Sequence, residues 1–171
     1  MQNSAAENAF VKDDPLTLCA KALSAAEEVL LASRRAVCKH LLIDGQVSPQ
    51  ALDAEQFAAH GFAWLSTYVE GLRQMLEWAT RLRELGELGE LETLLVQAAF
   101  GEYLNQIVGG IAISQVEIAR PADMGLADSE LKPLFEGAAA QLRAGGNTAH
   151  SRSRIAALIA DGDFGKLGLD D

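Results

Sequence analysis

The chain has 171 residues, the size of one compact domain, and a formal net charge of -10 at pH 7. Ala and Leu dominate its hydrophobic residues, and with only four prolines this composition favours helix. The acidic charge argues against a nucleic-acid partner, because it repels phosphate backbones. Charged residues interrupt the apolar stretches too often for a membrane span.

The N-terminal segment 1–14 is polar and acidic, unlike a signal peptide, and we expect it to be disordered or loosely ordered. The first predicted helix covers 15–43, where Asp14 caps Pro15 and Asp44-Gly45 stops the pattern. Residues predicted to face the core recur at spacings of three and four, as in a bundle helix. They are Leu16, Cys19, Leu23, Ala26, Leu30, Ser33, Val37 and His40.

Both cysteines fall on this predicted helix. Cys19 and Cys38 would lie about 28 Å apart at the helical rise per residue. A disulfide needs a much shorter separation. We therefore expect reduced thiols and a cytoplasmic protein.

A second helix is predicted over 49–85, opened by Ser48-Pro49 and ended by Gly86. Its core-facing residues are Ala58, Phe62, Leu65, Val69, Leu72, Leu76, Ala79 and Leu82. A second apolar face, rotated from the first, consists of Trp64, Tyr68, Gly71, Met75 and Trp78. Such a helix is either central in the bundle or half covered by a partner.

A third helix is predicted over 90–119, with Arg120-Pro121 closing it. Its core-facing residues are Val96, Phe100, Leu104, Ile107, Ile111 and Ile118. Gly101, Gly109 and Gly110 would permit the close approach of another helix, or a kink at the last two. On such a helix Glu117 and Arg120 would form an i,i+3 ion pair.

A fourth helix is predicted from Asp128 or Ser129 to Gly145-Gly146, and a short fifth from Thr148 or Ser151 to Asp161-Gly162. The predicted fold is all-α, an up-and-down bundle of three long helices plus one or two shorter ones. It forms one domain over 15–162, followed by a tail or linker over 163–171.

The sequence offers no recognised catalytic or metal-binding pattern. None of His40, His60 and His150 has a Glu three residues before it, as a di-iron bundle requires, and zinc-binding and phosphate-loop spacings are absent. Glu102 and Glu117 would lie about 22 Å apart on one helix, too far for paired acid–base work. We therefore predict no catalytic, cofactor-binding or metal-binding residue.

Two stretches resemble a known family. They are His60 to Gln74, HGFAWLSTYVEGLRQ, and Gly101 to Arg120, which begins GEYLNQIVGGI. They resemble the N-terminal helical extension of acyl-CoA dehydrogenases, closest to the (2S)-methylsuccinyl-CoA dehydrogenase type. The resemblance runs over about 15–169 and includes the closing DGDFGKLGLD.

In that family a flavin takes a hydride from the β-carbon of an acyl-CoA while a glutamate removes the α-proton. The segments that carry the flavin and the glutamate are not found in this sequence. The resemblance therefore implies an accessory domain that is non-catalytic by itself, with FAD bound by the full-length enzyme. It implies the dehydrogenase body or a second copy as partner, and we expect a homodimer.

The residues predicted for such an interface are Trp64, Tyr68, Trp78, Gly101, Gly109 and Gly110. Two alternatives remain open. One is a stand-alone interaction or structural bundle that docks a partner through the Trp64/Trp78 face. The other is a small-molecule-binding bundle with a cavity near Gly109-Gly110.

Overall fold

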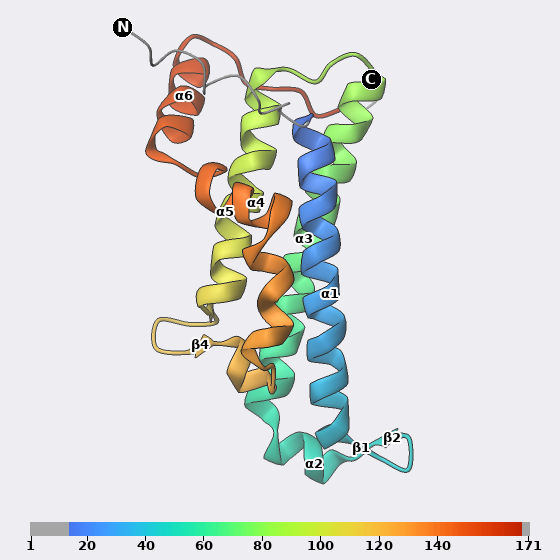
Figure 1. The fold of residues 1–171 in the computed structure, drawn as a ribbon. Coiled ribbons are helices and arrows are strands. Elements are labelled where there is room, and N and C mark those ends of the chain that lie inside the picture. The colour runs from blue at the N-terminus through green and yellow to red at the C-terminus, as the bar shows by residue number, and fades with distance from the viewer. Residues whose placement is uncertain (1–13, 169–171) are drawn as a thin grey trace, which may run out of the picture.

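The computed structural model describes residues 14–168, which fold mainly into helices (Figure 1). The bundle contains α1 (Pro15–Leu41), α3 (Gln56–Glu84), α4 (Glu90–Gly109) and a fourth rod made of the 3-10 helix η2 (Asp128–Phe135) followed by α5 (Gly137–Gly145). Helices α1 and α4 each pack against both α3 and α5. The predicted all-α bundle is confirmed.

Side-chain caps begin three of the helices, as their sequences predict. The Asp14 carboxylate accepts the Thr17 backbone N–H at 3.0 Å and opens α1. Ser48 caps α2 (Pro49–Ala54), and Thr148 caps α6 (Ala149–Ala160). Each cap satisfies a backbone N–H that has no partner within the helix.

The first helix is two residues shorter than predicted. Leu42–Ile43 form strand β1, which pairs antiparallel with β2 (Gln46–Val47). Asp44 and Gly45 between them both adopt positive φ, 51° and 76°. An Asp-Gly pair in this conformation makes the two-residue turn that matches the twist of a hairpin.

The predicted second helix is also interrupted. Glu55, with φ -111° and ψ 26°, separates α2 from α3. Helix α2 contributes no buried residue. The core-facing pattern accordingly starts only within α3, whose buried residues include Leu65, Val69 and Leu72.

The third helix ends at Gly109, so its prediction over 110–119 is wrong. Gly110 adopts a φ of 118°, and the chain turns into a hairpin of β3 (Ile111–Ala112) and β4 (Ile118–Ala119). The 3-10 helix η1 (Pro121–Met124) follows. β-Branched residues after Gly109-Gly110 favour strand over helix.

The hairpin also overturns two side-chain predictions. Ile118 is 39% exposed rather than core-facing. Glu117 and Arg120 do not share a helix, and no ion pair within residues 14–168 joins them. The Glu117 carbonyl instead accepts the Ile113 backbone N–H at 2.9 Å inside the hairpin.

The predicted fourth helix is divided at Glu136 into η2 and α5. Pro133 lies inside η2, where it cannot donate a backbone hydrogen bond. Gly137 starts α5 with a φ of +52°. The predicted fifth helix matches α6 closely.

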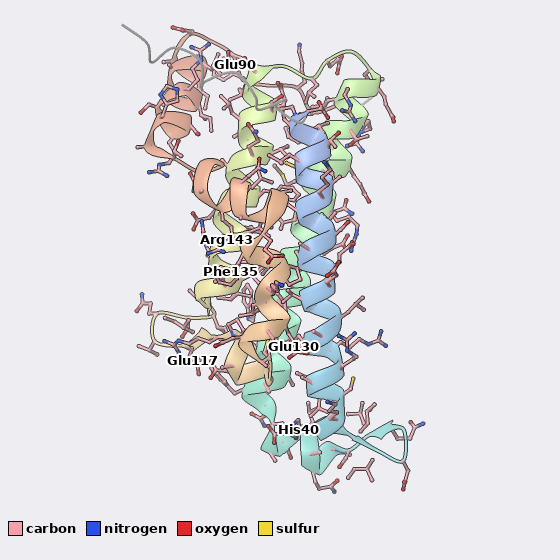
Figure 2. All side chains as sticks on the ribbon, in the orientation of Figure 1. His40, Glu90, Glu117, Glu130, Phe135 and Arg143 are labelled. Carbon is pink, nitrogen blue, oxygen red and sulfur yellow. The ribbon has the colours of Figure 1, made fainter. Side chains whose placement is uncertain are left out.

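The core lies between α1, α3, α4 and the fourth rod. Most residues predicted to face inward are buried, Leu65, Phe100 and Leu104 completely. Leu30 is half-buried against the core, whereas His40 is exposed at the end of α1, contrary to its predicted inward orientation (Figure 2). No helix within residues 14–168 is long and apolar enough to cross a membrane.

Candidate functional site

Two of the predicted interface residues belong to a row of rings along α3 that continues onto α4. We call His60, Trp64, Tyr68 and Tyr103 the aromatic row. Trp64 Nε1–H donates to His60 Nε2 at 2.7 Å, and the Trp64 and Tyr68 rings meet edge to face with centroids 6.4 Å apart. Tyr68 stacks on Tyr103 at 4.5 Å. The three Trp and Tyr rings are half-buried, so this chain itself covers much of the row.

A chain of hydrogen bonds continues from the row across α4 to α6. Tyr68 Oη–H donates to Gln106 Oε1 at 2.6 Å, and Gln106 Nε2–H donates to Glu102 Oε1 at 2.6 Å. Asn147 Nδ2–H donates to the other Glu102 oxygen at 2.8 Å and accepts from Arg152 at 2.9 Å. These side chains form hydrogen bonds with one another, which indicates a structural role.

The Tyr68 hydroxyl is held in its protonated form. Burial raises its pKa above the usual 10.0, and the neighbouring Tyr103 and Glu102 charges add to the effect. A protonated phenol is the form that donates to Gln106. The arrangement favours a fixed donor over a group that exchanges protons.

Trp78 lies further along α3. It is half-buried and packs against the core, together with Met75. The face predicted from Trp64 to Trp78 is therefore partly covered by the rest of the bundle.

The three predicted interface glycines have different surroundings. Gly101 is buried, and a Cβ on it would lie 2.6 Å from the Asn147 backbone nitrogen and 2.9 Å from the Leu142 carbonyl. Gly110 packs against Ile118, whereas Gly109 is exposed with open space beside it. The close helix approach predicted for Gly101 thus occurs within this chain, between α4 and the end of α5.

Arg143 makes a contact that residue spacing did not predict. Its guanidinium lies 4.4 Å over the Phe135 ring, and it donates to Asn105 Oδ1 and to the Leu134 carbonyl (Figure 2). Burial lowers the pKa of its guanidinium from the usual value. The contact fastens the fourth rod to α4.

The basic residues of the last helix are paired rather than gathered into a patch. Arg154 donates from two nitrogens to both Glu90 oxygens, at 2.7 and 2.6 Å. This pairing lowers the pKa of the exposed Glu90 carboxyl.

Glu92 holds the segment 163–168, which we call the anchored tail. The Glu92 side chain is buried at the start of α4, where Oε2 accepts the Gly89 backbone N–H at 3.0 Å. Its Oε1 accepts the Lys166 backbone N–H at 2.7 Å. Of the predicted tail 163–171, the last three residues lie outside the described residues, as does 1–13 of the predicted loose N-terminus.

The elements β1, β2 and α2 lie at the end of the bundle opposite the anchored tail (Figure 1), and they carry several exposed apolar side chains. We call this region the far-end surface, and its exposed large side chains are Leu42, Ile43, Val47, Leu52 and Phe57. The segment 41–57 contains three acidic residues and neither Lys nor Arg. The segment that carries these exposed apolar side chains is therefore acidic.

Surface depressions lie among residues 14–168. One of about 150 Å³ lies at the far end beside His40, Glu55 and Asp123. Another of about 440 Å³ lies between α1 and α3 and is lined partly by Leu23 and Arg73. Neither includes Gly109-Gly110, where a ligand cavity was the alternative prediction. No cluster of three or more His, Cys, Asp or Glu within residues 14–168 could hold a metal ion.

Comparison with known proteins gives one informative similarity. The chain matches no family model. It is 48% identical over 162 residues to (2S)-methylsuccinyl-CoA dehydrogenase of Cereibacter sphaeroides. The match covers 92% of this chain and 29% of that relative, so the chain spans less than a third of the relative's length. The predicted resemblance is confirmed: almost the whole chain is similar to one part of a (2S)-methylsuccinyl-CoA dehydrogenase.

Proposed function

We propose that this chain is an accessory helical domain of an acyl-CoA dehydrogenase of the methylsuccinyl-CoA type and is non-catalytic by itself. The observation that carries the proposal is the 48% identity over 92% of the chain, confined to 29% of the relative. In this proposal FAD and the acid–base chemistry belong to a dehydrogenase body, which is also the partner of the domain.

Several polar side chains support this role, because they are engaged in holding the bundle together. Both Glu102 oxygens accept hydrogen bonds, and Glu92 holds two backbone N–H groups. Arg143 joins two helical rods. Such groups maintain a rigid surface for a neighbouring protein unit.

A cytoplasmic location is part of the proposal. Cys19 and Cys38 both lie on α1 and are free thiols. Free cysteines are typical of a reducing compartment.

A chimera tests the proposal. In the chimera, this chain replaces the matching segment of the C. sphaeroides dehydrogenase. The rate at which the chimera oxidises methylsuccinyl-CoA is compared with the rates of the parent and of the parent without the segment. We expect the chimera to bind flavin and turn over as the parent does, and the shortened protein to lose activity or stability. This chain alone should neither retain FAD nor oxidise the substrate. An inactive chimera, or turnover by the chain alone, would contradict the proposal.

A homodimer is the second part of the proposal. Gly109 is supported as a contact because it is exposed on α4 with open space beside it. Close approach of a second copy there would make a two-fold contact. We expect sedimentation to show self-association of the isolated chain, weakened by Gly109→Leu. A strict monomer at high concentration, unchanged by this substitution, would limit Gly109 to a role within the chain.

A further inference from the structure

The anchored tail lies against the tip of the bundle, where α3 ends and α4 begins. It has no regular secondary structure, yet its backbone is tied to α4 through Lys166 and the buried Glu92. Asp163 Oδ1 accepts the Gly165 backbone N–H at 3.0 Å and supports the turn locally. The tail is thus held at its centre by a carboxylate that is 2% exposed.

Glycines recur every third residue, and two of them lie where the backbone comes close to the bundle. Gly162, Gly165 and Gly168 all adopt positive φ, at 93°, 74° and 65°. A Cβ on Gly165 would lie 3.3 Å from Glu92 Oε1, and one on Gly168 would lie 2.8 Å from Leu82 Cδ2. This path favours glycine because of its positive φ values and, at Gly168, because Leu82 leaves too little room for a Cβ.

Two large apolar side chains between these glycines face solvent instead. Phe164 is 83% exposed and Leu167 is 73% exposed. Aromatic and aliphatic side chains of this size are typical anchors of an interface core. Because the backbone beneath them is already held, docking them would cost less ordering entropy than docking a free linker.

We propose that the anchored tail is a docking element whose Phe164 and Leu167 side chains enter an apolar pocket on the dehydrogenase body. This inference rests on the proposed function. The body is a fitting occupant because about 70% of the relative lies outside the part that this chain matches.

A second copy of the chain fits less well at this surface. Asp161 and Asp163 both precede the exposed Phe164 in the sequence, and the chain as a whole carries a charge of -10. A two-fold contact centred on Phe164 would bring the same carboxylates of both copies together. Like charges at such a contact oppose association.

Hydrogen exchange on this chain alone and on the chimera tests the inference. Amides of 160–168 should exchange more slowly in the chimera by about tenfold or more, as expected for a docked segment. Phe164→Ser with Leu167→Ser should abolish this extra protection without shifting the thermal midpoint of the isolated chain. Val116→Ser, which alters another exposed side chain in the second hairpin, is the matched control and should change neither quantity.

A further variant separates docking from anchoring. Glu92→Gln should accelerate exchange of the tail in both proteins, because it weakens the acceptor of the Lys166 N–H. The Ser double variant leaves Glu92 intact, so it tests the outward contacts alone.

The two proposals can fail separately. Three results in an active chimera would overturn the docking role while the accessory function stands. The tail could gain no protection, the far-end surface could gain protection instead, or the tail protection could be unaffected by the Ser double variant. Tail protection in an inactive chimera supports docking and contradicts the accessory function. Tail protection that rises with the concentration of the isolated chain would make a second copy the occupant and overturn the inference.

Discussion

Gly101 and Gly109 lie on the same helix, but only Gly109 has room for a side chain. At Gly101 the backbone of the α5–α6 connection occupies the place of a Cβ. At Gly109 that place is open. Comparing the two positions therefore separates a glycine that close packing requires from one that packing within this chain does not require.

We predict that Gly101→Ala lowers the free energy of unfolding by about 1–3 kcal/mol, because two backbone segments must move apart. Gly109→Ala should be neutral or stabilising by no more than about 1 kcal/mol, since Ala favours helix. Urea denaturation of both variants at low protein concentration measures the difference. Equal effects at the two positions would mean that the α4–α5 contact is not closely packed.

At the scale of single elements, the start of α1 couples helix capping to pH. The Thr17 backbone N–H holds the pKa of the Asp14 carboxyl below its usual 3.8, and Arg83 contributes through a hydrogen bond and its charge. A carboxyl whose folded pKa is lowered stabilises the fold above its unfolded pKa. That contribution disappears as the pH falls through the folded value.

Asp14→Ala should therefore cost about 1 kcal/mol at pH 7. The cost should shrink as the pH falls below the usual carboxyl pKa of 3.8 and towards the lower pKa of Asp14 in the folded state. Ser48→Ala removes the uncharged cap of α2, so its effect should not follow the same titration. Denaturation curves for both variants across this pH range provide the measurement. An Asp14→Ala cost independent of pH would exclude the charged cap as the source of stability.

At the scale of the whole molecule, α6 is less integrated than the other long elements. It contacts mainly α4, and Ser151 is its only buried residue. Its attachment relies on the exposed Arg154–Glu90 pair and the Asn147–Glu102 hydrogen bond. Exposed ion pairs contribute little to stability.

We predict that backbone amides in α6 exchange with solvent well before those in α1 and α3. Local opening of α6 exposes little apolar surface, whereas opening α1 exposes much of the core. Native-state hydrogen exchange on the isolated chain measures both. Protection of α6 equal to that of α1 would show that the molecule opens only as one cooperative unit.

The sequence by itself determined the fold class, several helix starts and most of the core. Asp14, Ser48 and Thr148 mark helix starts through local hydrogen bonds, and apolar spacing at Leu65, Val69 and Leu72 records which face is buried. These signals act within a few residues of the chain. The stretches 60–74 and 101–120 also carried the resemblance that comparison confirmed.

Some features were decided only by the tertiary structure. They join residues that are distant in the chain, or they end a helix where the spacing of apolar residues predicts that it continues. The helix at 90–109 gives way to a hairpin because Gly110 can reverse the chain and Ile111 and Ala119 become buried together, a benefit invisible to helical spacing. Gly101 proved to be an internal contact because α5 returns beside it. Likewise, the backbone N–H of Lys166 meets Glu92 across 74 positions of the chain, and tertiary packing alone brings those two groups together.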